Sequence, residues 1–376
     1  MKHLIFIFLT FLSVLPTIAQ DNGIEWYTFQ SNAAMEFSNS YKKLALEDTY
    51  AIKITGEISY SDLRALFILS ANNALRFVDI SETTVVGDKF SAGQPGHFPS
   101  ASFSNEGGFN SSKLEYINLP NTITSIGELA FKNCTELATV IVHESVTKIG
   151  KQCFQGCTSL ETIELPNSIT VIEYGIFTDS GLVTFSVPSG LKTLTQGTFS
   201  YCNKLKSLYL GDNITKIEYN AVRDCPQLVE LTIGANTSYI DSYFVSGNSS
   251  LVKITCLNPT PPTCYVSQYS NPFTDFDCSK CSLYVPAESV ESYRKASCWS
   301  KFGSILPIEG AGINAVESDS DFEINSHGIF CSDKCHIKVF DVNGREIFNG
   351  ITNEVHLPLK GLFIISINGK VSKHVL

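Results

Sequence analysis

The chain has 376 residues, of which 43% are hydrophobic, 11% aromatic and 17% charged. This composition supports a large buried core and excludes an intrinsically disordered or collagen-like chain. The 27 Lys and Arg residues against 37 Asp and Glu residues give a formal net charge of −10, which disfavours a nucleic-acid partner.

The first segment has the three parts of a secretory signal peptide. Residues 1–3 carry the positive charge, residues 4–15 are apolar, and small residues lead to Ala19. We predict a signal peptide over residues 1–19, whose removal changes the charge to 26 − 37 = −11. A membrane anchor is the alternative, but the apolar run is about 12 residues long and a membrane-spanning helix needs about 20. The mature protein is therefore expected to be exported.

An internal repeat dominates the middle of the chain. Seven leucines recur at spacings of 23, 23, 22, 23, 23 and 23 residues, which is the signature of a solenoid. They are Leu114, Leu137, Leu160, Leu182, Leu205, Leu228 and Leu251. After each leucine, the pattern L-x-x-I-x-L predicts a half-buried strand, which is followed by a turn and a second short strand. The fold class is therefore a β-rich solenoid of ~23-residue coils with short strands and turns or short helices.

Each coil closes through a turn that carries a bulky apolar residue. Phe131, Phe154, Phe177, Phe199 and Phe244 share this position, with Val222 in one coil, and we expect their side chains to stack in an internal row. A second shared position holds Cys134, Cys157, Cys202 and Cys225, with Ser180 and Asn248 elsewhere. Such variation is typical of a small side chain that packs or hydrogen-bonds in a turn. The alternative is a disulfide between stacked coils, which lie about 4.8 Å apart.

The unit seen most clearly in residues 114–134, L-x-x-I-x-L-P-x-x-[IV]-T-x-I-G-x-x-A-F-x-x-C, resembles the BspA-like, or TpLRR-type, leucine-rich repeats of bacterial surface proteins. The resemblance covers residues 75–256, including a first repeat at residues 75–81. It implies a solenoid fold, and it weakly implies adhesion to matrix proteins or to other bacteria.

The same resemblance places caps at both ends of the solenoid, where a cover is needed. Residues 20–74 form the N-terminal cap, with a strand at residues 52–58 and a helix at residues 62–66. Residues 257–308 resemble the terminal strand-helix segment of Bacteroidota members. Both caps are expected to be α/β structures, and the aromatic residues of the second to seal the last coil.

Several cysteines lie outside the repeat position. They are Cys256, Cys264, Cys278, Cys281, Cys298, Cys331 and Cys335. For the first five, disulfides, free thiols and a zinc site all remain open, although zinc sites usually need a second pair beside a C-x-x-C. Cys331 and Cys335 are close enough in sequence to close a small loop.

No catalytic motif stands out. The chain has no G-x-S-x-G, H-E-x-x-H, phosphate loop or dinucleotide fingerprint. Glu161 and Glu164 fall on a repeat strand, where a solvated face explains them better than paired-acid glycosidase chemistry. We therefore predict a non-enzymatic protein with no cofactor and no metal site.

The outward face of the first strands is the candidate binding surface. Residues that flank the central apolar position point away from the core. The candidates are Tyr116, Asn118, Thr139, Ile141, Thr162, Glu164, Ser207 and Tyr209. The alternative is that this face has only a structural role, because threonine suits strands. The same alternative applies to a ladder of threonines on the second strands, which consists of Thr124, Thr147, Thr170 and Thr215. The apolar Tyr116, Ile141 and Tyr209 favour recognition of a partner instead.

The C-terminal end reads as a separate β segment. Residues 309–320 are small and acidic, which suits a linker. Residues 337–347 alternate into an Asn-Gly turn, which indicates a hairpin, and residues 355–370 indicate two more strands. We expect a small β-sandwich-like domain over residues 321–376.

This segment resembles the C-terminal sorting domain of type IX secretion cargo in Bacteroidota. The resemblance is carried by D-x-x-G-R at residues 341–345 and K-G-L-F-I-I-S-I at residues 360–367. It implies an export machinery as a partner and passage across the outer membrane, and it leaves open whether the segment is removed on maturation.

Together these observations predict a non-enzymatic cell-surface or secreted recognition protein of the adhesion type. It would bind protein or glycan partners through the repeat sheet. The alternative is a periplasmic or envelope scaffold without a host ligand.

Overall fold

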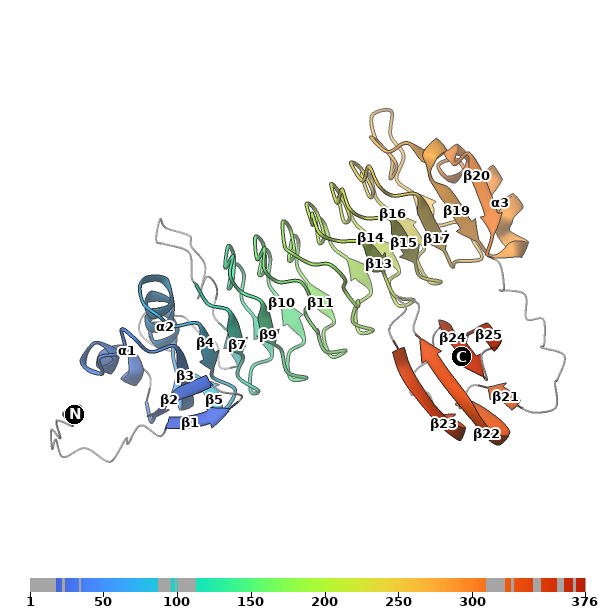
Figure 1. Cartoon of the computed structure of the whole chain (residues 1–376). Coiled ribbons are helices and arrows are strands. Elements are labelled where there is room, and N and C mark those ends of the chain that lie inside the picture. The colour runs from blue at the N-terminus through green and yellow to red at the C-terminus, as the bar shows by residue number, and fades with distance from the viewer. Residues whose placement is uncertain are drawn as a thin grey trace. The chain divides into compact units, whose positions relative to one another are not determined.

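A computed structural model of the chain describes most of the repeat region and its caps (Figure 1). The described residues are 18–21, 24–33, 35–86, 96–98, 100, 113–308, 322–325, 328–340, 346–356, 362–367 and 370–375. Most of the predicted signal peptide and the whole predicted linker lie outside them. The chain divides into two compact units, one of Met1–Val285 and Ser289–Leu306, the other of Pro286–Glu288 and Pro307–Leu376.

The N-terminal cap packs helices beside a short run of strands. Its elements are β1 (Ile18–Asp21), β2 (Ile24–Ser31), α1 (Glu36–Ser40), the 3-10 helix η1 (Tyr41–Lys43), β3 (Ala51–Ile58) and α2 (Tyr60–Asn72). Ser59 and Asp62 form a capping box that starts α2, because each side chain accepts a hydrogen bond from the backbone N–H of the other. β3 and α2 are the strand and helix expected here. β1 includes Ala19, the residue after which we predict cleavage.

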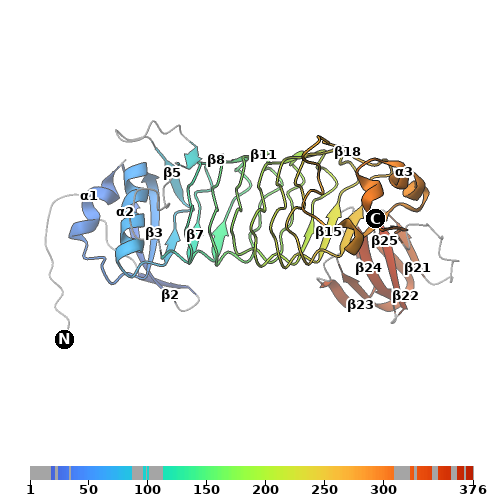
Figure 2. The ribbon, with the colours of Figure 1, turned by 90° about the horizontal axis from the view of Figure 1, so that it is seen from above.

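The first strands of the coils build parallel sheets along the repeats. They are β4 (Phe77–Asp79), β7 (Tyr116–Asn118), β9 (Thr139–Ile141), β13 (Ser207–Tyr209), β15 (Glu230–Ile233) and β17 (Lys253–Cys256). One sheet runs β1-β2-β3-β4-β7-β9, with β5 (Thr83–Val85) against β3. Another runs β13-β15-β17 and continues with β19 (Ser282–Val285) and β20 (Ser304–Pro307). Equivalent positions of successive coils face each other, as Ile117 and Val140 do. The expected solenoid is confirmed, and Figure 2 shows its coils side by side.

The second strands form another ladder of parallel pairs. They are β6 (His97–Phe98), β8 (Ser125–Ile126), β10 (Lys148–Ile149), β11 (Val171–Ile172), β12 (Thr193–Leu194), β14 (Lys216–Ile217), β16 (Tyr239–Ile240) and β18 (Thr263–Cys264). They are ordered β11-β10-β8-β6 in one sheet and β12-β14-β16-β18 in the other. Each expected second strand is present, although only its last two residues pair.

Both ladders are interrupted in the middle of the repeats. The strands expected at residues 160–165 and 182–187 do not form, apart from an isolated bridge between Ser186 and Tyr209. The second strands break at the same place, between β11 and β12. The prediction of a first strand in every coil is therefore wrong for these two coils.

Two local changes coincide with this interruption. The spacing from Leu160 to Leu182 is 22 residues, whereas the leucine spacings before and after it are both 23 residues. In the next coil Phe185 occupies the central core position that smaller aliphatic side chains fill elsewhere. Its ring packs between Phe177 and Phe199, with centroids 5.0 and 5.2 Å away. We attribute the interruption to the shorter turn and the bulkier core side chain, because strand pairing requires matched register and spacing.

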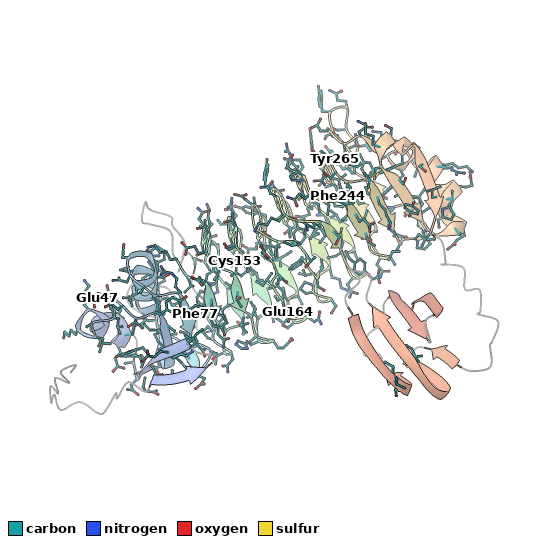
Figure 3. All side chains as sticks on the ribbon, in the orientation of Figure 1. Glu47, Phe77, Cys153, Glu164, Phe244 and Tyr265 are labelled. Atoms are coloured by element: carbon teal, nitrogen blue, oxygen red, sulfur yellow. A yellow bond between two sulfur atoms is a disulfide. The ribbon has the colours of Figure 1, made fainter. Side chains whose placement is uncertain are left out.

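A column of phenylalanine rings fills the centre of the coils. Neighbouring centroids along Phe98, Phe131, Phe154, Phe177 and Phe199 are 5.5, 5.5, 5.7 and 5.9 Å apart. All five rings are fully buried, but Phe244 (Figure 3) lies one residue earlier in its coil, at the position of Ala221, and Val245 follows Val222 in the row. The expected row is confirmed for the four phenylalanines from Phe131 to Phe199, and Phe98 extends it by one coil, but the prediction is wrong for Phe244.

The repeated cysteine position supplies a hydrogen-bond donor to the preceding coil. The Sγ atoms of Cys157, Cys202 and Cys225 donate to the carbonyl oxygens of Phe131, Phe177 and Phe199 at 3.2, 3.2 and 2.9 Å. In the coil where the position is Asn248, its Nδ2 donates to the carbonyl of Val222 at 2.7 Å. Cys134 and Cys157 are both free thiols, so the alternative disulfide is not formed. The structural role expected for this position is confirmed.

The C-terminal cap closes the last coil with buried aromatic rings. Its elements are η2 (Cys278–Lys280), β19 (Ser282–Val285), η3 (Ala287–Ser289), α3 (Val290–Lys295), η4 (Trp299–Lys301) and β20 (Ser304–Pro307). Tyr293 and Trp299 are fully buried, with ring centroids 5.3 Å apart. The sealing role expected for the aromatic residues is confirmed.

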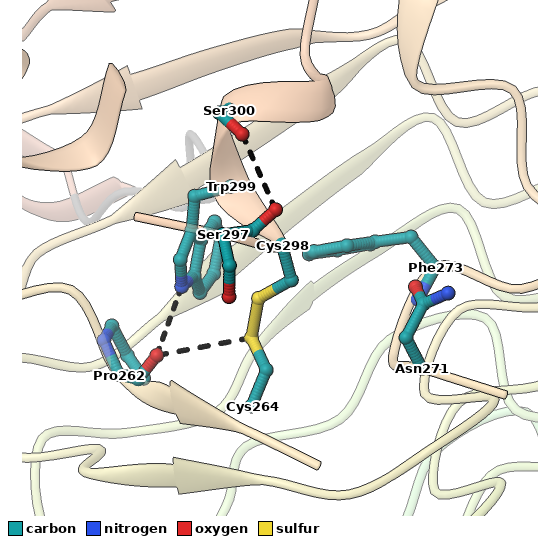
Figure 4. Close-up of a disulfide and its surroundings, with 8 residues drawn as sticks. All are labelled: Pro262, Cys264, Asn271, Phe273, Ser297, Cys298, Trp299 and Ser300. Atoms are coloured by element: carbon teal, nitrogen blue, oxygen red, sulfur yellow. Dashed lines mark hydrogen bonds between the residues drawn. A yellow bond between two sulfur atoms is a disulfide. The ribbon is translucent and has the colours of Figure 1, made fainter. Parts of the chain in front are cut away.

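One disulfide joins the solenoid to this cap. It links Cys264, at the end of β18, to Cys298, which precedes η4 (Figure 4). Cys256, Cys278 and Cys281 are free and buried. The side chains of Cys331 and Cys335 lie outside the described residues. Of the three states left open for the cap cysteines, the structure therefore has one disulfide and three free thiols.

The second unit contains an antiparallel sheet. Its strands are β21 (Phe322–Asn325), β22 (Gly328–Phe340), β23 (Glu346–His356), β24 (Leu362–Ile367) and β25 (Lys370–Val375). β22 and β23 form the expected hairpin, whose turn lies outside the described residues. The described strands make one sheet, ordered β21-β22-β24-β25 with β23 also on β22, rather than the two facing sheets of a sandwich.

Candidate functional site

The outward face of the N-terminal sheet brings aromatic residues into one row. In the register of this sheet, Trp26 on β2 lies opposite Ala51 on β3, which lies opposite Phe77 on β4, and Phe77 lies opposite Tyr116 on β7. Ile52 and Ile54 are fully buried on the inner face of β3, so the alternating residues of this row face outward. Thr139 on β9 ends the row.

Three aromatic side chains of this row, with Tyr50 just before β3, form an aromatic patch, defined here as Trp26, Tyr50, Phe77 and Tyr116. Phe77 stacks on Tyr116 at 5.8 Å, and Trp26 meets both rings edge to face at 6.5 Å. Tyr50 contacts Phe77 at 5.3 Å and is 47% exposed. Figure 3 labels Phe77. The patch is thus a packed set of rings outside the core, with Ala51 buried beneath them.

A polar row runs beside the aromatic patch, two residues further along each strand. Lys53 on β3 lies opposite Asp79 on β4, and Asp79 lies opposite Asn118 on β7. The Lys53 Nζ is 2.6 Å from a carboxylate oxygen of Glu82, and this hydrogen bond raises the pKa of Lys53. Asn118 Oδ1 is 2.9 Å from His143 Nε2. The outward face therefore offers aromatic surface and oriented polar groups side by side.

The eight predicted site residues fall into three separate places. Tyr116, Asn118, Thr139 and Ile141 lie together on β7 and β9. Thr162 and Glu164 are exposed, but their coil has no first strand; Figure 3 labels Glu164. Ser207 and Tyr209 lie on β13, in the other sheet.

Tyr209 is not part of the surface around Tyr116. The two residues are four coils apart, which is about 19 Å at roughly 4.8 Å per coil. Tyr209 is half-buried, and its hydroxyl is hydrogen-bonded to Asp212. Burial, followed by the nearby Asp212 carboxylate, raises the pKa of Tyr209. Tyr209 is therefore separated from Tyr116 and Ile141, and the prediction that the three act on one face stays untested.

The threonine ladder of the second strands has an internal structural role. Thr147, Thr170 and Thr215 donate from Oγ1 to a backbone carbonyl of the preceding coil, at 3.1, 3.4 and 3.1 Å. Thr124 does the same with Gly96 at 3.1 Å. These hydroxyls stabilise coil stacking, in agreement with the structural alternative.

Sequence reasoning missed three members of the aromatic patch. Phe77 follows Leu75 at the same offset at which Tyr116 follows Leu114, so the repeat pattern was a signal that could have found it. Trp26 and Tyr50 lie outside the repeats, where no periodicity indicates the direction of a side chain.

Buried thiols of the coils are held in the protonated form. Burial raises the pKa of Cys157 to about 12 and that of Cys256 to about 11, so both thiols stay protonated near neutral pH and are poor nucleophiles. Among the described residues, no group of three His, Cys, Asp or Glu side chains is placed to hold a metal ion. In the same residues, no helix has both the length and the apolar character to cross a membrane.

Comparison with protein families identifies the repeats. Residues 104–192 and 172–263 match the BspA type leucine rich repeat region, in six copies. This part of the chain is therefore similar to the BspA type of leucine-rich repeat, as the repeat unit suggests. The matches indicate no enzyme family. A comparison with curated proteins gives no match.

Solved structures of bacterial leucine-rich repeat proteins resemble parts of the chain. The T. pallidum protein TpLRR is 27% identical, with 39% of this chain and 71% of that chain covered and a TM-score of 0.37. A leucine rich cell surface protein from Faecalibacterium prausnitzii is 24% identical, with 59% and 63% covered and a TM-score of 0.41. A leucine-rich repeat protein from Bacteroides ovatus is 19% identical, with 75% of each chain covered and a TM-score of 0.39.

Proposed function

We propose that this protein is a non-enzymatic recognition protein that binds a protein or glycan partner through the outward face of its N-terminal sheet. The aromatic patch is the observation that carries the proposal. Tryptophan and tyrosine contribute large binding energies when a partner covers them, and clustered apolar side chains outside a core mark interaction sites.

The neighbouring polar row supports selectivity at this face. Lys53, Asp79 and Asn118 are fixed by the strands that carry them, and partners hold Lys53 and Asn118 in place. Hydrogen-bonding groups held beside aromatic rings can discriminate between partners of similar size. Ile141, 37% exposed on β9, extends the apolar area past Tyr116 and Thr139.

The test is a binding screen with the mature chain against a glycan array and a panel of purified matrix proteins. We expect Trp26→Ala with Phe77→Ala to weaken binding to any ligand found by about tenfold or more. Tyr209→Ala, on the other sheet, is the matched control and should leave binding unchanged. Circular dichroism checks folding of both variants. Equal losses in the two variants, or no ligand for the intact chain, would contradict the proposal.

The proposal includes a location at the cell surface or outside the cell. A cleaved signal peptide over residues 1–19 and a sorting-like segment over residues 321–376, similar to those of type IX cargo in Bacteroidota, would bring the repeats there. Protease shaving of intact native cells, followed by mass spectrometry, tests this. Repeat peptides should be released from the full-length strain and not from a strain truncated after Glu309. Protection in both strains would instead favour an envelope scaffold.

A further inference from the structure

A loop rich in tyrosine projects from the turn edge of the solenoid at its C-terminal end (Figures 1 and 3). Residues 265–271, called the tyrosine loop here, follow β18 directly. The N–H of Tyr265 donates to the carbonyl of Ile240 at 2.8 Å, and the N–H of Tyr243 donates to the carbonyl of Asn271 at 3.0 Å. Both ends of the loop are thus bonded to the preceding coil, and the residues between them are an insertion.

The large side chains of this loop face solvent. Tyr269 is 80% exposed, Val266 58% and Tyr265 43%, and Tyr269 has the highest exposure of any large hydrophobic side chain in the described part of the chain. Tyr219 and Tyr243 lie on the two preceding coils, with ring centroids 5.6 Å apart. We call these five residues the tyrosine edge, which is distinct from the aromatic patch: Tyr219, Tyr243, Tyr265, Val266 and Tyr269.

The loop is held in one conformation although its tip is exposed. Ser267 Oγ accepts hydrogen bonds from the backbone N–H groups of Tyr269 and Ser270, at 3.2 and 3.0 Å. The backbone N–H of Ser267 donates to the carbonyl of Ser270 at 2.9 Å. Asn271 closes the loop through a 2.8 Å bond from its N–H to Thr274 Oγ1.

The cap anchors both ends of the loop (Figure 4). Cys264, immediately before the loop, is in the disulfide with Cys298. Phe273, just after the loop, packs against Trp299 at 5.3 Å and Phe302 at 4.9 Å. A loop that is ordered before binding loses little conformational entropy when a partner arrives, which favours affinity.

The side chains and charges indicate what kind of partner fits. Tyrosine, serine and asparagine make up most of the loop, and this combination contacts protein surfaces well because rigid aromatic rings alternate with adaptable hydrogen-bonding groups. Residues 254–279 contain Asp275 and Asp277 but no Lys, Arg or His, and because Asp277 is ion-paired with Lys280 at 3.0 Å, Asp275 is the acidic group that remains beside the loop. An acidic, tyrosine-bearing surface attracts guanidinium and ammonium groups, both by charge and by cation–π contact.

We propose that the tyrosine edge is a preformed docking site for a protein segment that carries exposed arginine or lysine. This site is independent of the face under the proposed function. It lies on other coils and follows a second strand, β18, whereas Phe77 and Tyr116 of the aromatic patch lie on first strands. Its occupant would place basic side chains over the exposed rings of Tyr265 and Tyr269.

The test uses a phage-displayed library of random linear peptides as the probe, selected on the full chain. The matched counter-selection uses the triple variant Tyr265→Ser, Val266→Ser, Tyr269→Ser, whose three side chains are exposed and should not be needed for folding. We expect the recovered peptides to be enriched in arginine or lysine and to bind the triple variant about tenfold or more weakly. Their affinity should also fall with added salt.

Two control variants test whether peptide binding depends on this loop and not on exposed aromatic rings in general. Tyr201→Ser removes a tyrosine of similar exposure, 47%, outside the loop and should leave the peptide affinity unchanged. Trp26→Ala should also leave it unchanged, so failure at one site is distinguishable from failure at the other. Recovery of only acidic peptides or of peptides that bind the triple variant equally well would overturn the proposal. Loop-dependent binding of a neutral glycan on an array would overturn it in favour of a sugar ligand.

Discussion

The ring centroids of Trp26 and Tyr116 lie 6.5 Å apart, although β3 and β4 separate their strands in the sheet. Three strand spacings of about 4.8 Å place the two backbones about 14 Å apart. The Trp26 side chain must therefore lie along the outer surface, above the small Ala51, to reach Tyr116. A tryptophan held along the outside of a sheet gives this face both binding potential and an intrinsic spectroscopic reporter.

The two tryptophans should differ in their access to solvent. Trp26 is half-buried on the outer face, whereas Trp299 is fully buried in the cap. We expect acrylamide to quench the native fluorescence through Trp26, so Trp26→Phe should remove most of the quenchable emission and shift the remainder to shorter wavelength. Trp299→Phe is the matched variant and should leave the quenchable part. Equal quenching in both variants would contradict the placement of Trp26.

The repeated cysteine position should depend on its hydrogen-bond donor more than on its thiol. Cys157→Val fills a similar volume but removes the donor to the Phe131 carbonyl, and it should lower the free energy of unfolding by about 1–3 kcal/mol. Cys157→Ser keeps a donor and should cost less, since Ser180 fills the same position naturally. Urea unfolding followed by circular dichroism measures both. A valine variant as stable as the serine variant would show that packing alone decides this position.

The free thiols of the C-terminal cap should make stability fall at high pH. Burial raises the pKa of Cys278 to about 11 and that of Cys281 to about 12. Unfolded cysteines ionise near pH 8.5, so the unfolded chain loses protons that the native chain keeps. The contribution of these thiols to stability is therefore complete below about pH 8.5 and is lost as pH rises toward about 11 to 12.

Thermal unfolding across this pH range checks the effect. The slope of stability against pH should become shallower in the double variant Cys278→Ser, Cys281→Ser, because serine does not ionise there. Tyrosines also titrate at high pH, so the comparison between variants carries the result and not the slope of the intact chain alone. Identical slopes in the two proteins would contradict the assignment.

The sequence predicts the solenoid well because its information is periodic. The leucine spacing indicates the coils, and the shared positions of Phe131 and Cys157 indicate an internal ring row and a turn donor, all of which the structure contains. The interruption near Phe185 is harder to predict, since the 22-residue spacing and the phenylalanine in place of isoleucine are small departures from the repeat pattern. Whether adjacent strands pair depends on backbone spacing, which the pattern does not encode.

The candidate site is less predictable for a related reason. The repeat pattern identifies Tyr116 as outward-facing but says nothing of which neighbours its ring meets. Trp26 and Tyr50 come from the non-repetitive cap. The strand register brings Trp26 into the row of Phe77 and Tyr116, and Tyr50, just before β3, contacts Phe77. Tyr209 matches the pattern equally well, and the pattern does not indicate its contact with Asp212.

The shortened coil should be sensitive to even one added carbon atom. A Cβ at Gly181 would collide with the carbonyl oxygen of Thr158, a backbone atom that cannot move aside. Gly181→Ala should therefore lower the free energy of unfolding by about 1–3 kcal/mol. Gly303→Ala is the control, because the nearest atom to its Cβ would be the Ser279 carbonyl oxygen at 3.5 Å. Denaturant unfolding of both variants measures the difference, and equal stabilities would mean that the turn can relax.

The disulfide between Cys264 and Cys298 should stabilise the end of the solenoid. Its cysteines are separated by 34 residues in the chain, and closing a loop of that length in the unfolded state corresponds to about 4 kcal/mol in the chain-entropy treatment. We expect a reductant to lower the melting temperature of the intact chain. The variant Cys264→Ser, Cys298→Ser should melt at the lower temperature without reductant.

This double variant also isolates the cause of the effect. Cys256, Cys278 and Cys281 are free thiols in the same region, so a reductant has no bond to break among them. Adding reductant to the double variant should therefore leave its melting temperature unchanged. A further drop there would mean that another disulfide had formed, and an intact chain insensitive to reductant would mean that Cys264 and Cys298 contribute no stability as a pair. Because the same bond anchors one end of the tyrosine loop, its loss should loosen the loop even where the coils remain folded.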